Sequence, residues 1–157
     1  MRAPMSRPRR LFMRSPIFLL RLRLGWLLGG RFLLLETTGR RSGKRRFTAL
    51  EIPLRDPPET WYVASGWGFE SDWYRNLEAN AKASVTVGFT RFACEADLVG
   101  PDASAALMAR YSREHPRLAL ALASAVGWDI NDHAPDWHRL GRQSVPWVRL
   151  TRPTTEN

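Results

Sequence analysis

Cysteine is almost absent from this sequence of 157 residues, which contains a single one, Cys94. One thiol cannot form an internal disulfide, and it cannot supply the ligands of a cysteine-based zinc site. Histidine is scarce too, and two of the three lie in the stretch His133-Ala-Pro-Asp136-Trp-His138. The proline in this stretch disrupts the helical spacing that would bring these side chains together, so we predict no metal site.

Lysine is also rare, yet the chain is strongly basic through its arginines. Lys44 and Lys82 are the only lysines, and the net charge is still +9. Residues 1–46 hold thirteen basic side chains against one acidic one, whereas the rest of the chain has a slight excess of acid. This localised charge predicts an anionic partner for the N-terminal third: a nucleic acid, lipid headgroups or a phosphorylated cofactor.

No apolar stretch is long and uninterrupted enough to predict a membrane-spanning helix. The run 17–35 contains three arginines and a Gly-Gly pair, which also argues against a signal peptide. After a basic segment, 1–14, residues 15–28 predict an amphipathic helix. Its apolar stripe can pack on the protein's own core or lie on an anionic membrane surface, and both alternatives stay open. The expected location is cytoplasmic, or peripheral on the cytoplasmic face of the plasma membrane.

Beyond the predicted first helix, short strand-like stretches alternate with turns. Strands are expected over residues 31–37, 46–54, 61–65, 84–89, 91–99 and 144–150, and further helices over 73–80, 102–114 and 116–126. About six mostly antiparallel strands with a few helices predict an α+β, mainly β fold that closes into a small barrel. We expect one domain, residues 15–150, followed by a polar tail, 151–157.

The stretch TTGRRSGKRR, residues 37–46, connects the first two predicted strands and holds five basic side chains. It is not a Walker loop, because only three residues separate Gly39 from Gly43 and Arg45 follows Lys44. Its glycines can expose backbone N–H groups, and its guanidinium groups can form forked hydrogen bonds. The loop therefore predicts a site for phosphate or carboxylate groups, with a solvated basic turn as the alternative.

A second informative stretch, ASGWGFESDWYRNLEAN, covers residues 64–80 and combines a glycine-rich bend with a short helix. It holds four aromatic side chains within eight positions: Trp67, Phe69, Trp73 and Tyr74. Gly66 and Gly68 would let the backbone approach a flat ring, which the aromatic side chains could then enclose. The alternative is an ordinary aromatic core.

Together the two stretches resemble the deazaflavin (F420)-dependent nitroreductase and F420H2-dependent quinone reductase family. The matching residues are Thr-Gly-Arg-Arg-Ser-Gly from 38 to 43, Arg46, Ala64-Ser65-Gly66, Trp73-Tyr74 and Asn76-Leu77-x-Ala79-Asn80. The resemblance spans about 32–87 and continues more weakly to the last predicted strand. It implies an FMN-binding-like split β-barrel and an F420-dependent oxidoreductase. FMN is the less expected cofactor, because it has no acidic tail to use so many arginines.

The resemblance also implies roles for individual residues. The phosphate and acidic tail of F420 would be held by the basic loop and the strand after it: Arg40, Arg41, Ser42, Arg46, Thr48 and Ala49. Ala64, Ser65 and Trp73 would lie against the deazaflavin, and the bend adds Gly66 and Trp67 to this set. Ser65 and Tyr74 are the candidate catalytic residues, Ser65 beside the reacting ring and Tyr74 as a donor toward an acceptor oxygen.

The sequence departs from the family pattern at several points. Gly66-Trp67-Gly68 stands where many relatives have Lys-Gly-Gly, Ala81 replaces a usual proline, and residues 116–140 contain no tyrosine. Activation of nitro prodrugs is therefore doubtful, and the expected acceptor is a quinone or another electron-poor conjugated molecule. Split barrels often pair, so a homodimer is considered. Two non-redox alternatives stay open: a basic nucleic-acid-binding module, and a non-catalytic carrier of a lipid or cofactor on the same barrel.

Overall fold

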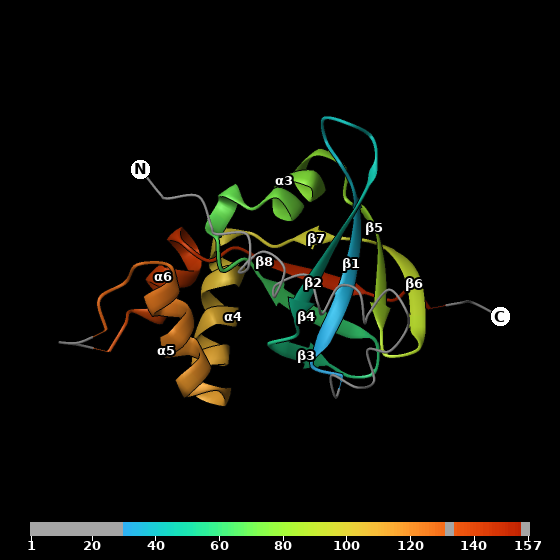
Figure 1. Ribbon diagram of the computed structural model, residues 1–157. Coiled ribbons are helices and arrows are strands. Elements are labelled where there is room, and N and C mark those ends of the chain that lie inside the picture. Colours follow the sequence, from blue (N-terminus) through green and yellow to red (C-terminus); the bar gives the residue numbers. More distant parts are fainter. Residues whose placement is uncertain (1–29, 131–133, 155–157) are drawn as a thin grey trace, which may run out of the picture.

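The computed structural model describes residues 30–130 and 134–154. Two four-stranded antiparallel sheets, with helices around them, make up this part of the chain (Figure 1). The predicted basic segment, the predicted helix 15–28, His133 and the end of the tail lie outside the described residues. Among the helices that are described, none has the length and hydropathy needed to cross a membrane.

The first sheet has the strand order β2-β1-β5-β6. Its strands are β1 (Phe32–Thr38), β2 (Arg45–Glu51), β5 (Lys82–Val87) and β6 (Thr90–Glu95). β1 is the apolar, extended run that the sequence predicts: Leu33 and Leu35 are fully buried in the core between the sheets, and Leu34 is buried as well. β5 and β6 form a hairpin with a two-residue turn, in which Gly88 adopts a φ of 56° that favours glycine.

The second sheet has the strand order β3-β4-β8-β7, so the last strand of the chain lies inside the sheet. Its strands are β3 (Leu54–Asp56), β4 (Thr60–Ala64), β7 (Asp97–Leu98) and β8 (Trp147–Thr151). β8 pairs along its whole length with β4 and over two residues with β7. A segment close to the end of the sequence therefore holds this sheet together.

The helices form two groups. The short η2 (Gly68–Glu70) and α3 (Asp72–Ala79) follow β4, and α3 lies beside the loop between β1 and β2 at one end of the molecule (Figure 1). The other group consists of α4 (Pro101–Glu114), α5 (Pro116–Ala125) and α6 (Trp137–Gln143). Proline occupies the first position of α4 and of α5, where its missing N–H is not needed.

Two hydrophobic cores hold these layers together. The core between the two sheets includes Leu33, Leu35, Val85 and Val148, all fully buried. The core between the second sheet and α4–α6 surrounds Trp147, whose side chain is also fully buried. Burial of this much apolar surface is the main contribution to the stability of such a fold.

α4 and α6 pack unusually closely, and a glycine allows it. A Cβ atom built on Gly141 of α6 would overlap the carbonyl oxygen of Ser104 and lie 2.7 Å from Cβ of Met108 and 2.9 Å from Cα of Ala105. These neighbours belong to α4, and two of the three are backbone atoms. The two helices can therefore meet at this distance only because residue 141 has no side chain.

The structure confirms the α+β, mainly β fold class with antiparallel strands, but the described residues form more strands than expected. The predicted strand 46–54 is divided into β2 and β3 at Ile52-Pro53, where proline has no N–H for the ladder. The predicted strand 91–99 is likewise divided into β6 and β7. The helix expected at 73–80 is confirmed as α3, whereas α6 was not expected.

Candidate functional site

A pocket of about 840 Å³ opens between the β1–β2 loop and α3, and we call it the loop pocket. It is lined by Gly39, Arg40, Arg41, Ser42, Arg45, Arg46, Phe47, Thr48, Asp72, Trp73 and Asn76. Four arginines face one carboxylate in this set, so the pocket carries a net positive charge. The pattern fits an anionic ligand whose phosphate or carboxylate groups accept forked hydrogen bonds.

The loop owes its shape to its two glycines. The N–H of Gly39 donates to the carbonyl of Lys44, and the N–H of Gly43 donates to the carbonyl of Gly39, both at 2.8 Å. Gly43 has a φ of 65°, which a side chain would disfavour. A Cβ atom at residue 39 would lie 2.8 Å from Oγ of Ser42 and 3.3 Å from Nε of Arg46. A glycine at 39 therefore leaves room between two donor groups of the pocket.

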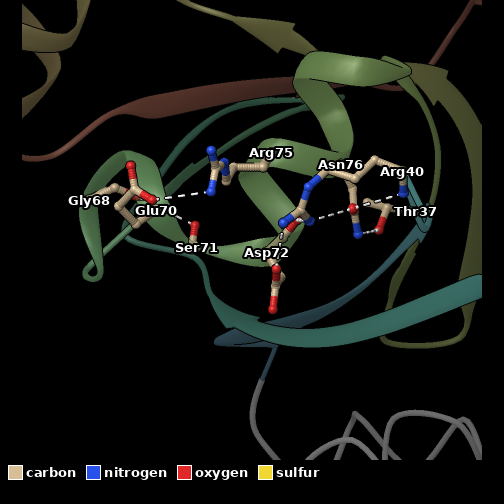
Figure 2. Close-up of polar contacts among 8 residues, drawn as sticks. All are labelled: Thr37, Arg40, Gly68, Glu70, Ser71, Asp72, Arg75 and Asn76. Atoms are coloured by element: carbon tan, nitrogen blue, oxygen red, sulfur yellow. Dashed lines mark hydrogen bonds and ion pairs between the residues drawn. The ribbon is translucent and has the colours of Figure 1, made fainter. Parts of the chain in front are cut away.

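Arg40 is fixed to α3 by a network that begins in the backbone (Figure 2). The Oδ1 atom of Asn76 accepts from the backbone N–H of Arg40 at 3.1 Å and from its Nη1 at 3.0 Å. Nδ2 of Asn76 donates to Oγ1 of Thr37 at 3.3 Å, and both residues are 3% exposed. Nη2 of Arg40 also forms an ion pair with Asp72 at 3.0 Å. One buried amide thus holds the loop against the helix.

Asn76 is the functional residue that the sequence reasoning missed. The motif Asn76-Leu77-x-Ala79-Asn80 contributes to the family resemblance, but the sequence alone indicates no role for its first residue. The available signal was an amide on the same side of a short helix as Trp73 and Leu77, where a buried amide needs partners. The three hydrogen bonds of Asn76 supply those partners.

The remaining basic side chains of the loop pocket are less constrained than Arg40. Arg46 makes a long contact of 3.4 Å from Nη2 to Oγ of Ser42, and Arg45 forms an ion pair with Glu36 at 3.4 Å. Within residues 30–130 and 134–154, the guanidinium group of Arg41 has no hydrogen-bond or ion-pair partner. Arg41, Arg46 and Ser42 therefore present donors that a ligand can use.

The glycine-rich bend between β4 and α3 is closed by the buried hydroxyl of Ser65. Ser65 is 1% exposed, and its Oγ donates to the carbonyl of Gly68 at 2.6 Å and lies 2.7 Å from Oγ of Ser71. Gly68 has a φ of 68°, as a tight bend requires. The Trp67 side chain is 57% exposed on the outside of the bend. The hydroxyl of Ser65 therefore makes its hydrogen bonds within the bend.

Tyr74 lies in the core next to the bend. Its ring makes edge-on contacts with Trp73 and Phe69, with centroids 6.0 and 5.8 Å apart. The side chain is buried, and burial together with the charge of Glu78 raises the pKa of the Tyr74 phenol. The phenol therefore keeps its proton at neutral pH and can act only as a neutral donor or acceptor.

The loop pocket brings together one part of the predicted site. Of the residues predicted to bind the cofactor, its lining contains Arg40, Arg41, Ser42, Arg46, Thr48 and Trp73. The other predicted residues are not part of the lining: Ala49, Ala64, Ser65, Gly66, Trp67 and Tyr74. The basic loop and the first residues of β2 thus share a pocket with Trp73 of α3, whereas the bend lies beside it.

The family model described as F420H(2)-dependent quinone reductase matches residues 22–123, which include the loop, the bend and α3. The chain belongs to the F420H(2)-dependent quinone reductase family. It is therefore an F420H2-dependent oxidoreductase with coenzyme F420 as its cofactor, as the resemblance implied. No curated protein matches the sequence.

Solved structures similar to this F420H(2)-dependent quinone reductase family member have low sequence identity to it. The F420-H2 dependent reductase FDR-A is 18% identical, over 76% of this chain and 93% of that chain, with a TM-score of 0.51. A pyridoxamine 5'-phosphate oxidase-related FMN-binding protein from Nostoc punctiforme is 15% identical, over 88% and 79%, with a TM-score of 0.55. A protein described as a domain-swapped dimer is 18% identical, over 87% and 99%, with a TM-score of 0.51. These similarities show that the fold is shared with FMN-binding split-barrel proteins.

The residues of the loop pocket fit the cofactor of the F420H(2)-dependent quinone reductase family. A phosphate and an acidic tail need several donors in one place, and Arg41, Arg46 and Ser42 supply them around the space left by Gly39. Trp73 adds a mostly buried aromatic surface to the same pocket. The donor chemistry and the volume therefore agree with a long anionic molecule that ends in a flat ring.

Proposed function

We propose that the loop pocket binds F420 and that the enzyme reduces a quinone or another electron-poor conjugated molecule. The observation that carries the proposal is the meeting of several arginine side chains and an aromatic side chain in one pocket of about 840 Å³. When bound, reduced deazaflavin supplies a hydride to an acceptor stacked on its ring. FMN remains the less favoured cofactor, because its single phosphate would leave most of the arginines unused.

The residues of the chain itself bind and orient the cofactor. Arg41, Arg46 and Ser42 hold the phosphate and the acidic tail, and Thr48 and Trp73 also line the pocket. Asn76 keeps the loop in position. The carboxylate of Asp72 already neutralises part of the charge of Arg40, so Arg40 contributes less attraction to an anion than Arg41 does. The roles of Ala49, Ala64, Gly66 and Trp67 stay predictions.

Several wider aspects of the function also belong to the proposal. A homodimer is supported by the similar structure described as a domain-swapped dimer. Peripheral membrane contact through the predicted helix 15–28 would bring the enzyme near lipid-soluble quinones, and it stays a prediction. Nucleic-acid binding and a non-catalytic carrier remain the alternatives against which the enzyme is tested.

Titration of the purified protein with F420, followed by cofactor fluorescence, tests the site. Arg41→Ala and Arg46→Ala should each weaken F420 binding about tenfold or more, because each removes a charge-assisted donor from an acidic ligand. Asp72→Asn should strengthen binding a few-fold, because the guanidinium group of Arg40 loses its competing carboxylate. FMN should bind more weakly than F420.

Arg75→Ala is the matched control for this titration. Arg75 lies on α3 and pairs with Glu70 at 3.2 Å, but it does not line the loop pocket. Its loss should leave F420 affinity unchanged. If F420 does not bind saturably, or if Arg75→Ala weakens binding as much as Arg41→Ala, the assignment of this pocket is wrong. Salt-dependent binding of arbitrary DNA would then favour the nucleic-acid alternative.

Ser65→Ala separates a structural from a catalytic role for this serine. The substitution removes the hydroxyl that closes the bend, so we expect the free energy of unfolding to fall by about 1–2 kcal/mol. Urea denaturation measures this, with Ser124→Ala on the exposed side of α5 as the control. A large drop in kcat of quinone reduction, with unchanged stability, would instead support Ser65 as a catalytic residue.

A further inference from the structure

A group of charged side chains crosses the first sheet beside the loop pocket, and we call it the sheet patch. It consists of Arg45 on β2, Glu36 on β1 and Arg91 on β6. Arg45 lines the loop pocket, and Glu36 lies opposite Phe47, which lines it too. In Figure 1 the strands of this sheet lie side by side below the β1–β2 loop, with β6 at the far edge. The sheet patch therefore begins at the loop pocket and ends at the opposite edge of the sheet.

The register of the strands places these three side chains on one face of the sheet. In an antiparallel ladder, directly paired residues point to the same side, and so do residues two positions apart on one strand. Arg45 pairs with the residue two positions after Glu36. Arg91 pairs with Thr86, which is two positions along β5 from the partner of Glu36. Leu35, next to Glu36, points the other way into the core between the sheets. The sheet patch thus lies on the outer face.

One carboxylate joins the two arginines of the sheet patch. Oε2 of Glu36 accepts from Nη2 of Arg91 at 2.7 Å, and its Oε1 lies 3.4 Å from Nε of Arg45. The Glu36 side chain is 16% exposed, whereas those of Arg45 and Arg91 are 75% and 48% exposed. Among the described residues, the two guanidinium groups have no other partner. Both arginines therefore keep unused N–H groups in contact with solvent, and the patch has a net positive charge.

The unused donors of the sheet patch fit a second carboxylate. A guanidinium group has several N–H donors in a fixed fork, and each arginine offers only one nitrogen to Glu36. Glu36 itself shows that a carboxylate can lie between these two side chains. A ligand that extends from the loop pocket onto the sheet patch would need further acidic groups along its length. The acidic tail of F420 has this chemistry, because each glutamyl unit of the tail adds a carboxylate.

We propose that Arg45 and Arg91 form a second carboxylate subsite, which binds the far end of the acidic tail of F420. The inference rests on the proposed function, since the tail reaches the sheet patch from the loop pocket. The phosphate and the first part of the tail stay in the loop pocket, and carboxylates farther along accept from Arg45 and then from Arg91. Glu36 limits this attraction, because its negative charge offsets part of the charge of the two arginines. A short tail does not reach Arg91.

Fluorescence titration with two forms of F420, one with a single glutamyl unit and one with a long tail, tests the subsite. Arg91→Ala should weaken binding of the long-tailed form about threefold to tenfold, with little effect on the short-tailed form, because it removes a charge-assisted donor that only a long tail reaches. Glu36→Gln should strengthen binding of the long-tailed form about threefold, since it removes the negative charge between the arginines. Arg41→Ala, within the loop pocket, should weaken binding of both forms.

Arg149→Ala is the matched control for Arg91→Ala. Arg149 lies on β8 of the second sheet, its side chain is 49% exposed, and it pairs with Asp97. It does not line the loop pocket. The substitution removes the same charge from an exposed ion pair, so the affinity for both forms of F420 should stay as in the wild type. The control therefore separates a local contact with the tail from a change in the net charge of the protein.

Three outcomes would overturn the second subsite. The first is that Arg91→Ala binds long-tailed F420 as tightly as the wild type does. The second is that Arg91→Ala weakens the short-tailed form to the same extent, and the third is that Arg149→Ala has the same effect as Arg91→Ala. If the wild type binds neither form, the proposed function fails together with the subsite. If it binds both and any of the three outcomes is found, only the subsite fails.

Discussion

Gly141→Ala is expected to lower the free energy of unfolding by about 3 kcal/mol, measured by urea denaturation. The added methyl group would overlap the carbonyl oxygen of Ser104 and come within 2.9 Å of Cα of Ala105. Backbone atoms cannot rotate away as the end of a flexible side chain can. α6 would have to move away from α4, and the core around Trp147 would lose part of its packing.

Gly100→Ala provides the control, because a Cβ atom there meets nothing within 4 Å. Gly100 precedes α4 with a φ of −67°, which alanine adopts without strain. Its replacement should change the free energy of unfolding by less than about 1 kcal/mol. If the two variants are equally stable, the helices have more freedom to separate than their packing suggests, and the argument from close approach is wrong.

Asn76→Leu is expected to weaken F420 binding by at least tenfold and to lower the free energy of unfolding by about 2–4 kcal/mol. Leucine has a similar size, but it leaves the backbone N–H and guanidinium group of Arg40 without their acceptor. The buried hydroxyl of Thr37 loses its donor as well. The loop would no longer be held against α3, so the donors of Arg41 and Ser42 would lose their position. The loss of affinity is measured by the same F420 titration.

Asn80→Leu is the matched control on the same motif. Asn80 is exposed, and its Oδ1 accepts only from the backbone N–H of Lys82, at 3.1 Å, among the described residues. We expect an effect on stability below about 1 kcal/mol and no effect on F420 affinity. If Asn76→Leu binds F420 as the wild type does, the position of the loop does not depend on this amide.

Much of the fold follows from local patterns in the sequence. The apolar run of residues 31–37 predicted β1, and the glycine-arginine composition predicted the loop that follows it. The division of one predicted strand at Pro53 was also visible in principle, since proline lacks the N–H of a strand ladder. α6 is different, because Trp137–Gln143 is short and largely polar. The helix is held by its contact with α4, and a contact between distant segments leaves no local pattern.

Some residues of the candidate site are likewise indicated by the local sequence, and others depend on contacts between distant segments. Charge and glycine spacing indicated Arg41, Ser42 and Arg46, because these properties act within a few residues of each other. The direction of the Ser65 hydroxyl could not be predicted, since it depends on a bend that returns the carbonyl of Gly68 toward it. The three hydrogen bonds of Asn76 join residues far apart in the chain. Only the tertiary structure brings them together.

The central place of β8 in the second sheet has a consequence for synthesis on the ribosome. The chain emerges from its N-terminus, so β4 and β7 are made before residues 147–151, the strand that lies between them. Until then, both strands have unpaired edges, and the space later filled by Trp147 is open. The second sheet can therefore be completed only after residues 147–151 have been made, and nascent chains that stop before β8 should be targets for chaperones and proteases.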